Sequence, residues 1–296
     1  MKIKDICTSV TDGSHNPPQG IEKSEYMMLS SKNIFDDEIT FDEPRFLSEK
    51  DFEREHKRTQ IAVGDVLLTI VGTVGRTAVV DEDMPAFALQ RSVAVLHPKN
   101  DVCLPRFLMY ALRGKRTYIE NRAKGVAQKG IYLKEVSDID IYIPDISNQE
   151  IIINKLDKVN TIIKLRQEEL LALDNLIKAR FVELFDGKYP EDTLLNLCNI
   201  VDYRGKTPEK VEHGLPFITA KNVKMHHMTL EPREYISKET YDKVMVRGFP
   251  KEGDVVFTTE APLGNVCRIP HFDTEFYIGQ RIVTMQTDAL NPTYLE

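Results

Sequence analysis

The sequence predicts an α+β protein in which two homologous mixed α/β domains are separated by a long coiled-coil-type helix. At 296 residues the chain is longer than the about 100 to 200 residues of one domain. Short motifs recur at a constant spacing, and apolar residues between the recurrences follow a heptad. We therefore expect a first domain over residues 1–145, a spacer helix over 146–187 and a second domain over 188–296 that is incomplete at its C-terminal end.

The repeat consists of four motifs that recur at one offset of 189 residues. The pairs are Lys32-Asn33-Ile34 with Lys221-Asn222-Val223, Phe46-Leu47-Ser48 with Tyr235-Ile236-Ser237, Gly64-Asp65-Val66 with Gly253-Asp254-Val255, and Gly75 with Gly264. A constant offset across several matches indicates duplication. The second copy stops at a point equivalent to about residue 109 of the first, so it lacks counterparts of residues 113–144 and of a second long helix.

Within each copy, short β-branched runs bounded by glycine or charged residues predict strands. In the first copy these runs are Asp65–Ile70, Thr77–Val80 and Ser92–Leu96, and in the second they are Asp254–Thr258 and Arg281–Met285. Residues Pro105–Glu120 predict a helix. The Gly64-Asp65 pair is interpreted as a turn that starts a strand, and the four scattered cysteines as buried thiols.

The predicted spacer helix carries a heptad seam in which eight of ten positions are apolar. The apolar positions are Ile152, Leu156, Val159, Ile163, Leu170, Leu173, Ile177 and Leu184, and the exceptions are Arg166 and Arg180. Ser147 and Glu150 have the spacing of a capping box, and Gly187 followed by Pro190 predicts the other end. Such a helix is roughly 55 to 60 Å long. The alternative is a core helix buried across one domain.

An exposed seam of this size needs a partner, because monomers rarely expose so much contiguous apolar surface. We expect the helix to pair with a second copy of the chain or with another polypeptide that carries the missing half. The remaining alternative is that the sequence is a fragment.

Charge is distributed unevenly along the chain. The formal net charge of −7 opposes nucleic-acid binding. Residues 113–134, however, hold seven basic residues against the single acid Glu120. Only the face presented to DNA must be basic, so this basic stretch is a candidate contact surface.

No enzymatic motif is complete, and we expect no catalytic site, metal or cofactor. Asn16-Pro17-Pro18-Gln19 resembles a methyltransferase loop, but Gln19 stands where an aromatic residue would stack on a flipped base. Gly205-Lys206-Thr207 resembles the end of a phosphate loop, but Ile200 occupies the position of its first glycine. The seven histidines lack the spacing of metal ligands.

In layout, the chain resembles the specificity subunit of type I restriction-modification systems. The resemblance rests on Val10-Thr11-Asp12-Gly13-Ser14-His15, its counterpart Val201 to Pro208, the Gly-Asp-Val motifs, and Gln128-Lys129-Gly130-Ile131 leading through Ile141-x-Ile143-Pro144 to Asn148-Gln149. It implies two target-recognition domains that each read half of a bipartite DNA site, and a helix that sets the spacing of the halves. The implied partners are double-stranded DNA, methyltransferase subunits that dock on the helix, and a motor and nuclease subunit.

Hydrogen-bond donors at loop positions are the candidate DNA contacts, because planar or charged donors suit base edges and phosphates. In the first domain they are Arg76, Gln90, Arg91, Lys124, Gln128 and Lys129, and in the second Arg204, Lys206, Gln280 and Arg281. A surface ion pair or a strand-end hydrogen bond is the competing interpretation of each. His15 and Asp12 are interpreted as closing an N-terminal turn.

Two other functions are compatible with this layout. The chain could be one piece of a fused restriction-methylation protein, or a truncated assembly or decoy subunit that pairs through its helix without reading DNA productively. The absence of a long apolar run or a signal-peptide core predicts a cytoplasmic protein with no membrane association.

Overall fold

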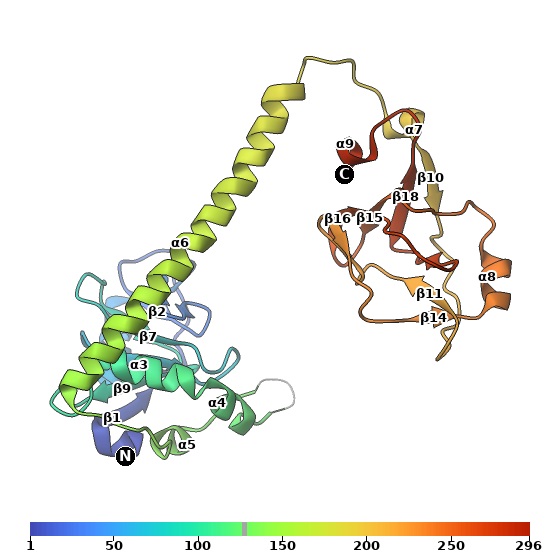
Figure 1. Ribbon diagram of the computed structural model, residues 1–296. Coiled ribbons are helices and arrows are strands. Elements are labelled where there is room, and N and C mark those ends of the chain that lie inside the picture. The colour runs from blue at the N-terminus through green and yellow to red at the C-terminus, as the bar shows by residue number, and fades with distance from the viewer. Residues whose placement is uncertain (126–128) are drawn as a thin grey trace. The chain divides into compact units, whose positions relative to one another are not determined.

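The computed structural model describes residues 1–125 and 129–296, which divide into two compact units, Met1–Leu176 and Ile177–Glu296 (Figure 1). The elements of the first unit are α1 (Ile3–Ile6), β1 (Cys7–Asp12), β2 (Met27–Leu29), β3 (Ile34–Phe35), β4 (Glu38–Ile39), β5 (Arg45–Phe46), α2 (Glu49–Thr59), β6 (Val66–Thr69), β7 (Thr77–Val79), β8 (Phe87–Leu89), β9 (Val93–Pro98), α3 (Pro105–Gly114), α4 (Arg116–Arg122), α5 (Leu133–Ser137) and α6 (Ile146–Phe185), which continues into the second unit. The second unit then has α7 (Leu194–Leu197), β10 (Asn199–Asp202), β11 (Leu215–Ile218), β12 (Val223–Lys224), β13 (His227–Met228), β14 (Tyr235–Ile236), α8 (Lys238–Val244), β15 (Val255–Thr259), β16 (Leu263–Arg268), β17 (Tyr277–Ile278), β18 (Ile282–Gln286) and α9 (Pro292–Leu295).

Three sheets build the first unit. An antiparallel sheet has the strand order β1-β9-β6-β7, a three-stranded sheet has the order β5-β2-β8 with β2 parallel to β8, and β3 pairs with β4. Strand β6 is buried along its whole length because it lies between two neighbours and under α3. The largest apolar cluster joins this sheet to α1, α3 and the segment before α6.

The second unit repeats the same three sheets. Its strand orders are β10-β18-β15-β16 and β14-β11-β17, again with the middle strand parallel to the third, and β12 pairs with β13. The duplication predicted from the motifs is therefore confirmed at the level of strand pairing. The α+β class with two homologous domains and a long helix is confirmed with it.

The Gly-Asp-Val motif has the structural role expected of it in both copies. Gly64 has φ +88°, and the Asp65 carboxylate accepts a hydrogen bond from the Ala62 backbone amide at 2.7 Å. Asp254 accepts one from the Lys251 amide at 2.9 Å. Each aspartate thus closes the turn that starts the central strand. All four cysteines are free and buried, as predicted.

Helix α6 occupies the predicted spacer, and its 40 residues correspond to about 60 Å. One detail of the prediction is wrong: Asp145, rather than Ser147, caps the helix. The Asp145 carboxylate accepts hydrogen bonds from the Asn148 backbone amide and from the Ser147 hydroxyl, both at 2.9 Å. A carboxylate two residues earlier is the stronger acceptor for the unpaired amides of the first turn.

The predicted helix over Pro105–Glu120 is interrupted. Helix α3 ends at Gly114 and α4 begins at Arg116, because Lys115 adopts φ −98° and ψ 7°. This break lets α4 turn across the β7 end of the sheet, where Arg116 reaches Gly75 and Asp36. Gly114, the weakest helix former after proline, stands immediately before the break, so the sequence does carry a signal for it.

Candidate nucleic-acid interface

Two predicted contacts of the first unit, Arg91 and Lys124, line one hollow of about 280 Å³. Arg91 follows strand β8, and its backbone amide donates to the carbonyl of Ser14 at 2.9 Å. Lys124 is held by two backbone hydrogen bonds with Gly130, each 2.9 Å long. Both side chains are exposed. Segments far apart in the sequence therefore present two cations to the same surface recess.

The hollow that holds Arg91 also contains an acid that is already paired. Asp12 is in contact with His15 at 2.7 Å and with Arg58 at 3.1 Å. The expected turn-closing contact between His15 and Asp12 is present, and it removes a free carboxylate from beside the two cations. Tyr132, which is 73% exposed, lines the same recess and was missed by the sequence interpretation. An exposed aromatic ring can stack on a base or a sugar.

A neighbouring hollow of about 420 Å³ is lined by Arg76, Lys129 and the Gly72 turn. The Gly72 amide donates a hydrogen bond to the carbonyl of Lys129 at 3.0 Å. Next to it, Val71 and Gly130 form an isolated antiparallel β-bridge. The Gly72 turn and the end of the basic stretch are therefore adjacent. Gln128, the remaining predicted contact of this region, lies outside the described residues.

Arg76 has a structural role beside its predicted one. Its guanidinium lies 4.9 Å from the centre of the Phe35 ring, and Nη1 donates to the Ile34 carbonyl at 3.4 Å. These contacts tie strand β7 to the β3–β4 hairpin. Arg76 is thus only partly available to a ligand, and the sequence offered no sign of this because Phe35 is 41 residues away in the chain.

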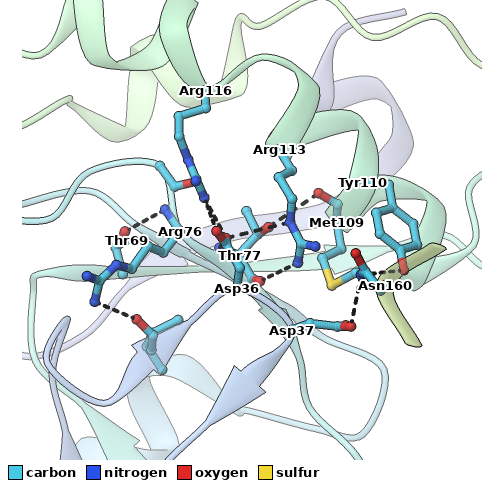
Figure 2. A network of polar contacts seen from close by, with 12 residues as sticks. Asp36, Asp37, Thr69, Arg76, Thr77, Met109, Tyr110, Arg113, Arg116 and Asn160 are labelled. Carbon is cyan, nitrogen blue, oxygen red and sulfur yellow. Dashed lines mark hydrogen bonds and ion pairs between the residues drawn. The ribbon is translucent and has the colours of Figure 1, made fainter. Parts of the chain in front are cut away.

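Part of the basic stretch is neutralised by an acid from another segment (Figure 2). Arg116 donates to both carboxylate oxygens of Asp36 at 2.5 and 2.7 Å, and Arg113 lies 3.6 Å from the same carboxylate. Although burial opposes ionisation, these arginines and the Thr77 backbone amide hold the pKa of Asp36 below its ordinary value. The free basic charge of the stretch is therefore smaller than its sequence suggests.

The same network continues to helix α6 and fixes it on the first unit. Tyr110 donates to the Asp157 carboxylate at 2.5 Å, and Asn160 donates to the Tyr110 hydroxyl at 3.0 Å and to Asp37 at 3.2 Å. Arg106 also donates to Asp157, at 2.6 Å. Figure 2 shows Tyr110 and Asn160 directed toward each other beside Asp37. The first turns of α6 are thereby fastened to α3 by side chains, in addition to apolar packing.

In the second unit, three of the four predicted contacts line one hollow of about 250 Å³. These are Lys206, Gln280 and Arg281. Arg204 lies outside that lining: its Nε donates to Asp202 at 2.6 Å, which corresponds to the ion-pair interpretation considered for every candidate. Lys210 and Lys221 line the hollow as well and were missed, although the Lys221 motif had already been recognised as part of the repeat.

Along residues 1–125 and 129–296, no group of three or more His, Cys, Asp or Glu side chains is arranged to hold a metal ion. Over the same residues, no helix has both the length and the apolar character needed to cross a membrane.

Comparison with known proteins identifies the family. A model described as the type I restriction modification DNA specificity domain matches residues 1–175, which is more than half of the chain. The chain belongs to this family. The resemblance drawn from the sequence motifs is thereby confirmed.

Curated relatives in the family are specificity subunits. The type I restriction enzyme EcoBI specificity subunit of Escherichia coli is 26% identical over 189 residues, which cover 62% of this chain and 38% of the relative. The MjaVIII specificity subunit of Methanocaldococcus jannaschii is 23% identical over 199 residues, covering 59% and 45%. The chain thus spans less than half of the length of these two relatives.

A solved structure shares the fold. A chain from a structural study of complex assembly and conformational transition in the type I R-M system matches all of this chain and 77% of its own length. The TM-score is 0.59 at 17% sequence identity. At this identity the likeness extends to the arrangement of the elements.

Proposed function

We propose that the chain is a non-catalytic DNA-recognition subunit of a type I restriction-modification complex. In this proposal each unit reads one half of a bipartite site in double-stranded DNA. The observation that carries it is the gathering of separate donors in surface hollows: Arg91 with Lys124 in the first unit, and Lys206 with Gln280 and Arg281 in the second. Membership of a DNA specificity family supports the same conclusion.

The residue types in these hollows suit different parts of DNA. Arginine and glutamine can form two parallel hydrogen bonds with a guanine or adenine edge, so Arg91, Gln90, Gln280 and Arg281 are the proposed base readers. Lysines neutralise phosphates and release counterions, so Lys124 and Lys129 are the proposed backbone contacts. Four candidates remain. Lys206 is a further lysine suited to a phosphate, and Gln128 lies outside the described residues. Arg76 and Arg204 would join the others only if DNA displaced their present contacts.

Helix α6 is proposed to set the spacing between half-sites and to dock methyltransferase subunits. The complex is proposed to be cytoplasmic, and a motor and nuclease subunit would join it for cleavage. Its seam supports a pairing role, because every apolar seam position is at least 36% exposed. The seam consists of Ile152, Leu156, Val159, Ile163, Leu170, Leu173, Ile177 and Leu184. A second copy of the chain is the partner that a purified sample can test.

DNA selection tests the recognition proposal. The full chain, with and without its methyltransferase subunit, is mixed with a library of random duplexes, and the bound fraction is sequenced. An interrupted motif should emerge. Enrichment of no motif, together with retained helix pairing, would instead indicate an assembly role.

Substitutions then separate the proposed roles. Replacing Lys124 and Lys129 by alanine should weaken binding to all sequences alike and reduce the salt dependence. Arg91→Ala should cost about 1 to 3 kcal/mol at particular bases. Lys50→Ala is the matched control, because Lys50 is exposed and basic but lies outside the basic stretch and lines neither hollow. An unchanged salt slope in the lysine variant would discard the basic stretch as a contact surface.

A further inference from the structure

The two units share a loop that a buried asparagine holds in place. Asn33 accepts a hydrogen bond from the Ser30 amide at 3.1 Å and donates to the Asp42 carbonyl at 2.9 Å. Asn222 accepts one from the Thr219 amide at 2.9 Å and donates to the carbonyls of Thr229 and Pro232, both at 3.1 Å. In both loops the preceding residue is an exposed lysine.

Each of these loops forms one wall of a surface hollow. Lys32 and Gln90 line the hollow in the first unit, and Lys221 and Gln280 line the hollow in the second. The two hollows are therefore equivalent positions of the repeat. Because a satisfied, buried amide anchors each loop, the lysine is presented by a rigid segment of backbone.

The equivalent hollows differ in charge. Four cations and one carboxylate, Glu234, line the second-unit hollow, and the cations are Lys206, Lys210, Lys221 and Arg281. The first-unit hollow has two cations and three carboxylates, which are Lys32, Arg45, Glu38, Asp42 and Glu43. The two recesses thus share walls from equivalent loops but differ in charge and in volume, which is about 720 Å³ in the first unit and about 250 Å³ in the second.

Two of the second-unit cations are already occupied. Lys210 lies 2.8 Å from Glu234, and Arg281 lies 3.4 Å from Glu260. Within the described part of the chain, Lys206 and Lys221 have no carboxylate within ion-pair distance, and both are exposed. The Thr207 hydroxyl adds a neutral donor to the same lining. An anion with several acceptor oxygens would satisfy this set.

We propose that the second-unit hollow binds a phosphate of the DNA backbone, with Lys206 and Lys221 supplying the charge. The equivalent hollow of the first unit does not, because its excess of carboxylates repels phosphate. This inference rests on the proposed DNA-binding function, and it adds a division of labour between equivalent sites: one copy anchors the backbone at a position where the other copy is unsuited to do so.

The test is the salt dependence of binding. Full-length chain and a labelled duplex of about 30 base pairs are titrated by fluorescence anisotropy between about 50 and 200 mM salt, where one phosphate contact contributes a slope of about 0.9 in log K against log salt. The Lys206→Ala/Lys221→Ala variant should lose about one contact. Its affinity deficit should therefore be about threefold to fourfold larger at the low end of the salt range than at the high end. The same deficit should appear on duplexes of unrelated sequence.

Lys32→Ala is the matched control, because Lys32 occupies the equivalent loop position in the acidic hollow. It should leave the salt slope unchanged. Thermal unfolding should be unchanged in both variants, since all three lysines are exposed.

The outcomes distinguish the two proposals. A wild-type salt slope in the double variant, with wild-type DNA binding intact, would overturn the phosphate site and leave the recognition function standing. Equal losses in the Lys32 variant would overturn the division between the copies. Failure of the wild-type chain to bind any duplex, alone or with its methyltransferase subunit, would overturn the recognition function itself and the phosphate site with it.

Discussion

Gln149 is predicted to be the side chain whose loss most weakens the junction between α6 and the first unit. It is fully buried at the start of the helix. Its Oε1 accepts from the Leu104 backbone amide at 2.8 Å, and its Nε2 donates to the carbonyls of Val102 at 2.9 Å and Pro144 at 2.8 Å. One amide thus joins three segments: the loop before α3, the start of α3 and the segment leading into α6.

The expected cost follows from these three hydrogen bonds. Each contributes about 0.5 to 1.5 kcal/mol net, and truncation leaves three partly buried backbone groups without this partner. A Gln149→Ala substitution should therefore lower the free energy of unfolding of the first unit by about 2 to 4 kcal/mol. The neighbouring Glu150→Ala is the matched control. Since Glu150 is exposed, its loss should change stability by about 0.5 kcal/mol or less.

Urea denaturation of the full chain measures this difference. The two units contribute separate transitions, and only the first-unit transition should move. Amide hydrogen exchange over residues 102–104 and 144–149 assigns the transition to the junction. A Gln149→Ala midpoint within experimental error of the Glu150→Ala midpoint would refute the argument that this amide holds α6 to the domain.

Three further predictions concern other contacts. The hydrogen bond that the His97 ring donates to the Asp65 carboxylate raises the pKa of His97. The stabilisation from the charged ring is therefore complete below the unfolded pKa of about 6.5 and is lost as pH rises through the folded value. His97→Gln, which copies the residue at the same position of the second unit, should remove this decline in a pH series of unfolding curves. If that variant declines like the wild type above pH 6.5, His97 is not the cause. Asp157→Ala should lower the free energy of unfolding of the first unit by about 1 kcal/mol, as measured by urea denaturation, because the Arg106–Asp157 pair is partly exposed. A loss as large as that of Gln149→Ala, or no loss, would contradict the role given to Asp157 in holding α6 to α3. If two copies of the chain pair through α6, Leu173→Asp should convert the oligomer into monomers in sedimentation velocity without altering the unfolding curve. A wild-type chain that sediments as a monomer at every concentration would exclude self-pairing through α6.

The sequence was most informative where it repeats itself. The motifs at a constant offset predicted two equivalent domains, and the paired sheet orders confirm this because strand pairing is fixed by local alternation and by turns that both copies retain. Helix α6 was predictable for a related reason: a heptad seam that continues from Ile152 to Leu184 leaves few other structures available.

Contacts between distant segments were not predictable in this way. A sequence window counts Arg113 and Arg116 as free charge, yet Asp36, from a hairpin some 80 residues earlier, offsets one of their two positive charges. Arg76 is predicted as a donor at a loop position, but its stacking on Phe35 depends on the packing of β7 against β3. Lys221 was visible as a repeat motif, but only the folded loop shows that it borders the same hollow as Lys206.

The most direct test of DNA recognition is a map of methylated adenines across a host genome, with the chain expressed with and without its methyltransferase subunit. The account predicts modification of one interrupted motif only when both are present, and a symmetric motif if two copies pair through α6. Absence of modification under both conditions, with both proteins present and folded, would contradict the central claim that this chain directs a complex to a DNA sequence.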